Sequence, residues 1–128
     1  MSDAKTLKDF VSEAKSQIEE VGITEIATLL AEGYQVLDVR EPSEFLEGTI
    51  KGAINVPRGV LEPAADLVMK GREELQDRDK KWLLVCATSG RSAMAAYVLK
   101  QMGFKNIKNI DCGMRGLKDA KMDLSIPS

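Results

Sequence analysis

The sequence predicts an α/β domain built on a mainly parallel sheet. Three observations predict it. Short apolar runs, typical of strands buried on both faces, alternate with segments of helical periodicity. The links between them are short, as in βαβ units. The chain has 128 residues, of which 44% are hydrophobic and 30% charged, a composition suited to one globular domain.

The N-terminal segment 3–20 has the pattern of an amphipathic helix. Apolar residues recur there at helical spacing among charged and amide side chains. We expect residues 1–20 to form an extension that packs on a domain spanning 21–128, with a partner-binding helix as the alternative. The apolar positions are Leu7, Phe10, Val11, Ala14, Ile18 and Val21.

The first half of the domain alternates helices with strands. Residues 70–81 hold nine charges in twelve residues, which predicts a solvated loop or a frayed helix end. The elements expected before that segment are a short helix over 26–30 with Thr24 as N-cap and Gly33 as its stop, a strand at 35–39, a helix at 43–47 after Pro42, a strand at 53–56 and a helix at 60–69.

The second half begins with the most apolar strand, at 82–86. A helix follows at 91–102 and Gly103 ends it, as glycines commonly do. A further strand is expected at 106–111 and a last helix at 113–121.

Composition excludes several classes of function. Histidine is absent, which excludes histidine-based triads, histidine metal sites and imidazole acid–base catalysis. With a net charge of −2 and a pI near 5.3, the chain is not a typical binder of nucleic acid or of anionic membranes. No segment looks like a membrane span or a secretory signal, so we expect a cytoplasmic protein. We also expect no metal and no cofactor.

The segment 86–92 carries the candidate chemistry. Cys86 ends the apolar strand, and small residues then lead into a helix. Several backbone N–H groups can therefore point at the sulfur, and the helix N-terminus adds positive potential. Such surroundings favour the thiolate and hold an anion bonded to it. With Cys86 as nucleophile, the candidate substrate-binding residues are Ala87, Thr88, Ser89, Gly90, Arg91 and Ser92.

Two of these residues have alternative roles. Arg91 can neutralise a bound anion or tie the loop to a carboxylate elsewhere, since Arg suits both tasks. Ser92 is interpreted as a loop or cap hydroxyl, because no base is visible beside it. The local charge agrees with an anionic substrate: residues 91–128 hold seven basic and three acidic residues, although a solvated surface explains this equally well.

Four segments together resemble the rhodanese-like sulfurtransferases over residues 21–127. The resemblance implies a three-layer fold with a central, mainly parallel five-stranded sheet between helices. The segments are Asp38-Val39-Arg40-Glu41 with Glu44 and Phe45, the run 48–57, the cysteine loop, and Asp111-Cys112-Gly113 followed by Gly116-Leu117.

The resemblance also implies a mechanism. The Cys86 thiolate attacks a small anionic donor such as thiosulfate, sulfite leaves, and a Cys86 persulfide remains. A thiol, cyanide or a sulfur-carrier protein then removes the outer sulfur. The backbone amides of the loop stabilise the persulfide anion as an oxyanion hole would.

Two other functions stay open. A non-catalytic rhodanese module that binds a partner protein is one, although inactive modules often lose this cysteine. A phosphatase or arsenate reductase is the other. Four residues separate Cys86 from Arg91, whereas related dual-specificity phosphatases have five there. The shorter loop therefore favours sulfur transfer.

The remaining signature residues have mainly structural interpretations. Asp38 and Arg40 are expected to hydrogen-bond their neighbours rather than to catalyse. Arg58 ranks above Lys51 and Arg115 as a residue of the pocket rim, because it follows a strand end.

Three positions depart from the family pattern. Thr49 replaces a common histidine, and Leu117 replaces a common tryptophan. Ser89 stands where the family more often has glycine, so a positive φ would strain the loop there.

Cys112 stands where the family usually has glycine. It is either a tolerated small residue or a resolving thiol for Cys86.

Overall fold

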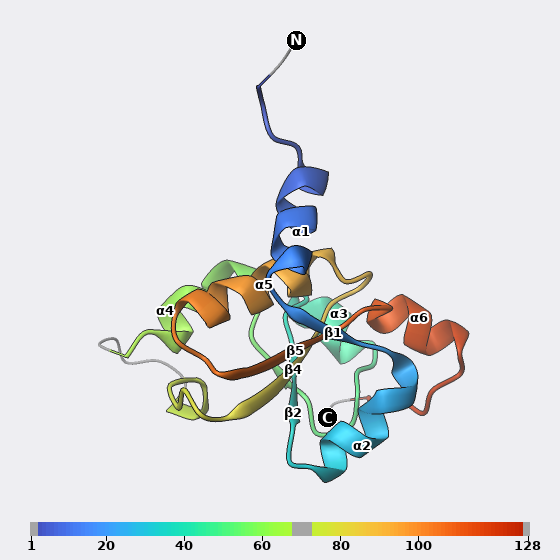
Figure 1. Ribbon diagram of the computed structural model, residues 1–128. Coiled ribbons are helices and arrows are strands. Elements are labelled where there is room, and N and C mark those ends of the chain that lie inside the picture. The colour runs from blue at the N-terminus through green and yellow to red at the C-terminus, as the bar shows by residue number, and fades with distance from the viewer. Residues whose placement is uncertain (1–2, 68–72, 127–128) are drawn as a thin grey trace.

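The computed structural model describes residues 3–67 and 73–126 of the chain. A parallel five-stranded sheet lies at its centre (Figure 1), in the order β1-β5-β4-β2-β3. This confirms the predicted fold class. The strands are β1 (Glu19–Val21), β2 (Gln35–Asp38), β3 (Ile54–Asn55), β4 (Lys81–Val85) and β5 (Asn106–Ile110).

Helices cover both faces of the sheet and give the expected three layers. In Figure 1, α4 and α5 lie above the strands and α2 lies below them. Short 3-10 helices span Ile23–Glu25, Arg58–Val60 and Glu73–Leu75. The α-helices are α1 (Leu7–Ser16), α2 (Ile26–Ala31), α3 (Pro42–Leu46), α4 (Leu61–Ala65), α5 (Gly90–Gln101) and α6 (Gly113–Asp119).

The central strand β4 explains why the cysteine loop lies where it does. Trp82 and Leu84 face the apolar cluster under α4 and α5, whereas Leu83 and Val85 face the cluster under α2 and α6. All four are fully buried, as expected for an inner parallel strand. Cys86 continues the alternation, so its side chain points to the α4 and α5 side.

The prediction of one helix over 3–20 is wrong at both ends, because α1 begins at Leu7 and ends at Ser16. Thr6 caps α1 in a capping box with Asp9, and the helix ends at Ser16. Residues 19–21 instead form the edge strand β1, which pairs in parallel with β5. Val21 fits the helical period by chance, since its side chain is buried under the sheet. A strand of three residues is too short to show its own alternation.

The helix predicted at 60–69 is shorter in the structure. A 3-10 turn precedes α4, which ends at Ala65, and Asp66 has an extended backbone. Residues 68 and 69 lie outside the described part of the chain.

The charged segment 70–81, of which residues 70–72 are not described, is more than a solvated loop. Leu75 is fully buried. Arg78 donates to the carbonyls of Ala65 and Met102, at 2.8 Å each, and lies over the ring of Phe104. This part of the segment is therefore anchored to the body of the protein.

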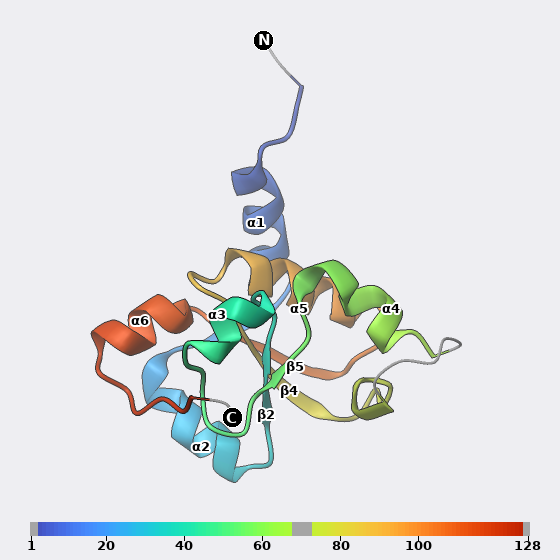
Figure 2. The same ribbon diagram turned by 180° about the vertical axis from the view of Figure 1, so that it is seen from behind.

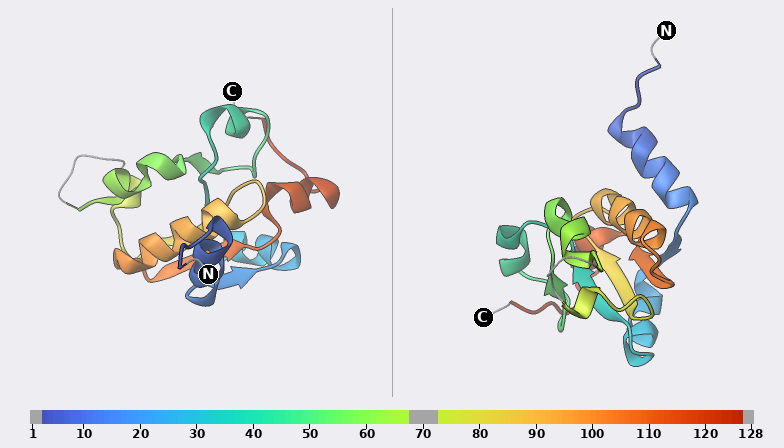
Figure 3. Two further views of the ribbon diagram at one scale, coloured as in Figure 1. Left: turned by 90° about the horizontal axis from the view of Figure 1, so that it is seen from above. Right: turned by 90° about the vertical axis from the view of Figure 1, so that its left-hand side faces the viewer.

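Helix α1 projects from the body and contacts it through α5 (Figure 3, right). The view from behind shows it above α5 as well (Figure 2). Ala14 is the residue of α1 that is buried, whereas Leu7 and Phe10 are 70% and 49% exposed. The C-terminal turns of α1 therefore seat the helix, and its first turn stands free of the sheet.

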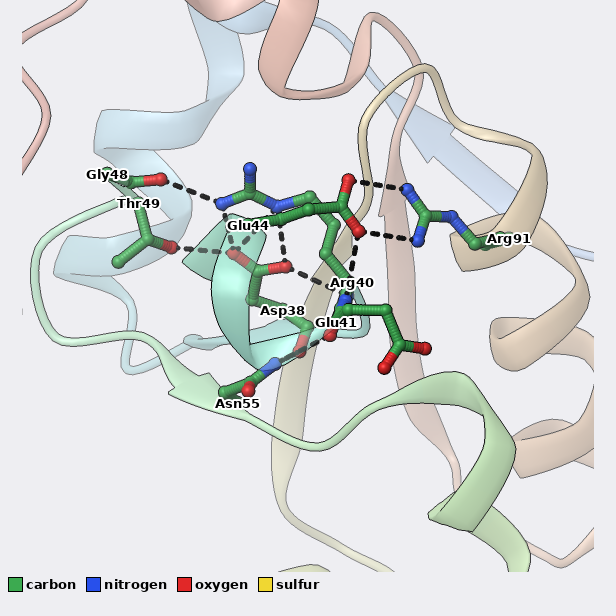
Figure 4. A network of polar contacts seen from close by, with 8 residues as sticks. All are labelled: Asp38, Arg40, Glu41, Glu44, Gly48, Thr49, Asn55 and Arg91. Atoms are coloured by element: carbon green, nitrogen blue, oxygen red, sulfur yellow. Dashed lines mark hydrogen bonds and ion pairs between the residues drawn. The ribbon is translucent and has the colours of Figure 1, made fainter. Parts of the chain in front are cut away.

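A buried ion pair anchors the carboxyl end of β2 (Figure 4). The guanidinium of Arg40 donates to the Asp38 carboxylate, with a shortest distance of 2.8 Å, and to the Gly48 carbonyl at 2.7 Å. The Thr49 hydroxyl donates to the same carboxylate, and Asn55 bonds the carbonyls of Asp38 and Arg40. Asp38 is fully buried, so these bonds compensate for its lost hydration.

Replacement of Arg40 by methionine should therefore destabilise the fold strongly. The Arg40→Met change leaves the Asp38 charge buried without its counter-ion, which costs about 3–5 kcal/mol. A matched control is Arg58→Met, which breaks the partly exposed pair with Glu62 and should cost about 1 kcal/mol or less. Urea unfolding of both variants measures the difference. Equal midpoints would show that the Asp38 network does not support the fold.

Candidate active site

The candidate site is the loop that joins β4 to α5, at the carboxyl edge of the sheet. Ligands of open parallel sheets bind at this edge. Cys86 is 1% exposed, and the N–H of Ser89 points at its Sγ at 3.1 Å. Among the residues of the loop, all of which the structure describes, one backbone donor faces the sulfur, whereas the sequence predicted several.

Ser89 has the strained conformation that its sequence position suggested. Its φ is +122°, in a region that residues with a Cβ rarely adopt. Its carbonyl accepts from the N–H of Ala93 at 2.8 Å and from the Ser92 hydroxyl at 3.2 Å. These bonds hold the backbone turn that directs the Ser89 N–H inward. Ser92 is fully buried in the first turn of α5, where its hydroxyl donates to the Ser89 carbonyl and does not cap the helix.

Helix α6 supports the loop from its other side. The N–H groups of Met114 and Arg115 donate to the carbonyls of Cys86 and Ala87, at 2.7 and 2.9 Å. Gly113 has a φ of +61°, and a Cβ there would lie 2.5 Å from the Ala87 carbonyl oxygen. The loop can follow this path because residue 113 has no side chain.

Arg91 forms the contact with a carboxylate that was one of its two expected roles. Its guanidinium donates to both carboxylate oxygens of Glu44, at 2.9 and 3.0 Å (Figure 4). These hydrogen bonds are the main reason that the pKa of Glu44 falls from 4.5 to about 2, although burial of the carboxyl group acts to raise it. The same bonds are the main cause of the raised pKa of Arg91, and the charge of Cys86 as a thiolate raises it further. Arg91 thus links α3 to α5 within electrostatic range of the sulfur.

A cleft of about 260 Å³ opens beside the loop, between α3 and α6. Of its three basic residues, Arg115 and Lys118 come from the segment with surplus positive charge. Lys118 was not singled out from the sequence, although that surplus pointed to its region. The lining residues are Arg40, Glu44, Glu47, Ala87, Met114, Arg115, Lys118 and Asp119.

Arg58, the residue ranked first for the pocket rim, is not among the residues that line this cleft. It pairs with Glu62 at 2.8 Å and lines a small hollow of about 160 Å³ beside Phe10 of α1 and Tyr97 of α5. The strand end that precedes Arg58 directs it toward α1 and α5. Of these two arginines, Arg115 is the one that lines the cleft beside the cysteine loop.

Cys112 lies at the N-cap of α6 and is partly buried. Burial, and to a lesser extent Asp111, raise the pKa of its thiol. It packs with the cluster under α2 and α6, whereas Cys86 belongs to the cluster under α4 and α5. Both thiols are free. The role of a resolving thiol stays a prediction.

Within residues 3–67 and 73–126, no group of three or more Cys, Asp or Glu side chains is arranged to hold a metal ion. In the same part of the chain, every helix is too short or too polar to cross a bilayer.

Comparison with known proteins agrees with this geometry. The family model of the rhodanese-like domain matches residues 22–120. The chain belongs to the rhodanese-like domain family. This rhodanese-like domain is 30% identical over 96 residues to the human thiosulfate:glutathione sulfurtransferase, covering 70% of this chain and 84% of that protein. It is 31% identical over 98 residues to the thiosulfate sulfurtransferase GlpE of Pseudomonas entomophila, covering 77% and 83%.

A solved structure from Rhodopseudomonas palustris matches 98% of both chains, with a TM-score of 0.88 and 29% identity. That protein is described as of unknown function and as a possible tyrosine phosphatase. The match takes in α1, which precedes the segment matched by the family model. The chain spans only 53% and 58% of the length of two Bacillus subtilis relatives, YrkF and YqhL.

The contact between α6 and the loop predicts that Gly113→Ala is much more harmful than a comparable change elsewhere. Gly103→Ala is the matched control: φ is +99° there, but a Cβ meets nothing nearer than 3.9 Å. Both changes impose a side chain at positive φ, at about 1 kcal/mol. Only Gly113→Ala also presses on the Ala87 backbone, which adds about 1–3 kcal/mol.

Urea unfolding and hydrogen exchange of the peptide 86–92 measure this difference. We expect a lower midpoint and faster exchange in Gly113→Ala than in Gly103→Ala. Identical behaviour of the two variants would mean that α6 does not hold the loop.

Proposed function

We propose that this rhodanese-like domain transfers sulfane sulfur through a persulfide on Cys86. The Cys86 thiolate attacks the outer sulfur of thiosulfate, the S–S bond of the donor breaks, and sulfite leaves with the bonding electron pair. A nucleophilic acceptor then attacks the outer sulfur of the persulfide, and the thiolate is regenerated. The transfer is thereby divided into two easier steps.

The observation that carries the proposal is the Ser89 N–H, which points at the Cys86 Sγ at 3.1 Å. A donor in this place favours the thiolate before the reaction and the persulfide anion after it. The N-terminus of α5 and the charge of Arg91 favour negative charge in the same place. The proposal therefore assigns activation of the nucleophile to these donors and charges and not to a general base.

The size of the site supports a small donor. Four residues separate Cys86 from Arg91, and Cys86 is 1% exposed, which disfavours a bulky substrate at the sulfur. Arg115 and Lys118 line the adjoining cleft, where they would attract an anion such as thiosulfate. Cyanide, a small thiol or the exposed thiol of a sulfur-carrier protein would accept the sulfur there. A cytoplasmic location for this chemistry remains a prediction.

One observation favours a second candidate. The structural relative from Rhodopseudomonas palustris is described as a possible tyrosine phosphatase, and a Cys-dependent phosphatase would use the same loop position. A third candidate, a partner-binding module, draws on the exposure of Leu7 and Phe10 in α1. The short loop and the buried thiol weigh against the phosphatase, and the presence of Cys86 weighs against a purely non-catalytic module.

A thiosulfate:cyanide assay on the wild type, Cys86→Ser and Cys112→Ser tests the proposal. Loss of the nucleophile should lower the rate by about a thousandfold or more. Cys112→Ser removes the chain's second thiol and should stay within about twofold of the wild type, because it packs with the other cluster.

Activity that survives in Cys86→Ser would remove Cys86 as the sulfur carrier. Cys86-dependent hydrolysis of a phosphotyrosine peptide, without sulfur transfer, would establish the phosphatase instead.

A further inference from the structure

Lys15 in the last turn of α1 contacts the cysteine loop. Its Nζ donates to the Ser89 hydroxyl at 2.8 Å, across 74 positions of sequence. Glu20 lies 3.6 Å from the same Nζ and also accepts from the Asn109 side chain of β5 at 3.0 Å. The Lys15 ammonium is therefore placed between the loop and a carboxylate that the sheet holds in position.

The seat of α1 on α5 brings Lys15 to this place. Gly90, the first residue of α5, faces Val11: a Cβ on Gly90 would lie 3.4 Å from a Val11 methyl. Ala14, one residue before Lys15, is 1% exposed. Val11 and Ala14 seat the turn of α1 that precedes Lys15, so the position of the ammonium does not depend on the Lys15–Ser89 bond alone.

The contact adds a bond to the Ser89 side chain beside those that its backbone makes. The N–H of Ser89 donates to the Cys86 Sγ, its carbonyl accepts from Ala93 and Ser92, and its hydroxyl accepts from Lys15. With a φ of +122°, the residue is held in an unfavourable conformation by its surroundings. Release of the hydroxyl would remove one of the restraints on the turn that directs the N–H at sulfur.

We propose that Lys15 is a positioning residue of the active site: it fixes Ser89, and through Ser89 it keeps a backbone donor directed at the Cys86 sulfur. The inference rests on the proposed role of Cys86 as the reactive thiol. On this proposal, helix α1, which precedes the residues matched by the family model, contributes to the active site. Removal of Lys15 lowers the ionised fraction of Cys86 near neutral pH.

Other charges near the loop are mostly paired with one another. Arg91 is bound to Glu44 and Arg40 to Asp38, so in each pair the carboxylate offsets part of the arginine's charge at the sulfur. The Lys15 ammonium is likewise balanced in part by Glu20. The further titratable or charged groups around the loop are Glu47, Asp111, Cys112, Arg115, Lys118 and Asp119.

The test follows the alkylation of Cys86 in the full chain by iodoacetamide, with peptide mapping to separate it from Cys112. Lys15→Met removes the contact, and Lys8→Met removes the same charge from an exposed position on the same helix. At about pH 7, we expect Lys15→Met to react about two- to threefold more slowly and Lys8→Met to match the wild type. At about pH 9.5 the Lys15→Met rate should equal or exceed the wild-type rate, because a less stabilised thiolate is the stronger nucleophile.

Comparison of the two alkylation rates at high pH distinguishes an effect on the ionisation of Cys86 from an effect on the access of the reagent to its sulfur. A change in access to the sulfur would alter the rate by the same factor at both pH values, and that result would overturn the inference. Equal rates for Lys15→Met and Lys8→Met at neutral pH would also overturn it.

Measurements in a Ser89→Ala background test whether Lys15 acts through the Ser89 hydroxyl. If Lys15 acts through the Ser89 hydroxyl, Lys15→Met should change the neutral-pH rate by less than about 1.5-fold in Ser89→Ala, as in a double-mutant cycle. A full effect in that background would exclude the route. Lys15→Arg, which keeps a charged donor, should recover at least half of the lost rate, and failure to do so would count against positioning.

Folding does not confound the result. The Lys15 side chain is 33% exposed, and circular dichroism verifies each variant. If Lys15→Met unfolds, Lys15→Leu removes the same donor and tests the same prediction. If the alkylation rate of Cys86 depends on pH but does not change in Lys15→Met, this inference alone is rejected. Sulfur transfer that survives in Cys86→Ser rejects the proposed function.

Discussion

The candidate active site depends on one hydrogen bond, from the backbone N–H of Ser89 to the sulfur of Cys86. The bond needs a serine at a φ of +122°, a conformation that the loop would not adopt by itself. Its neighbours supply the restraint: α5 through Ala93 and Ser92, α6 through its contacts with Cys86 and Ala87, and α1 through Lys15. Backbone strain at this site is therefore held by three separate elements of the fold.

Two ion pairs beside the loop differ in kind. The pair of Asp38 and Arg40 is buried and anchors the end of β2, so its loss leaves an uncompensated charge in the core. The pair of Glu44 and Arg91 is about one third exposed and contributes less to stability. Its effect is local, because it holds a guanidinium near the sulfur without closing the cleft. The first pair supports the fold, and the second shapes the charge of the site.

The sequence was sufficient for the parts of the protein with strong local signals. β4 is a continuous apolar run, and the loop after it is defined by small residues between Cys86 and Arg91. β1 was missed because Glu19–Val21 is short and its burial comes from pairing with β5. The direction of Arg58, which lines the hollow beside α1 and α5, could not be predicted, because a strand end does not tell which way a long side chain turns. Lys15 could not be identified, since its contact with Ser89 depends on how α1 seats on α5.

The most direct measurement of the central claim is the mass of the Cys86 peptide after the full chain meets thiosulfate without an acceptor. The account predicts one added sulfur atom on that peptide, lost again when cyanide is supplied, and about one sulfite released for each modified chain. An unmodified Cys86 peptide, or sulfur found on Cys112 instead, would contradict the claim that the loop builds its anion site around Cys86.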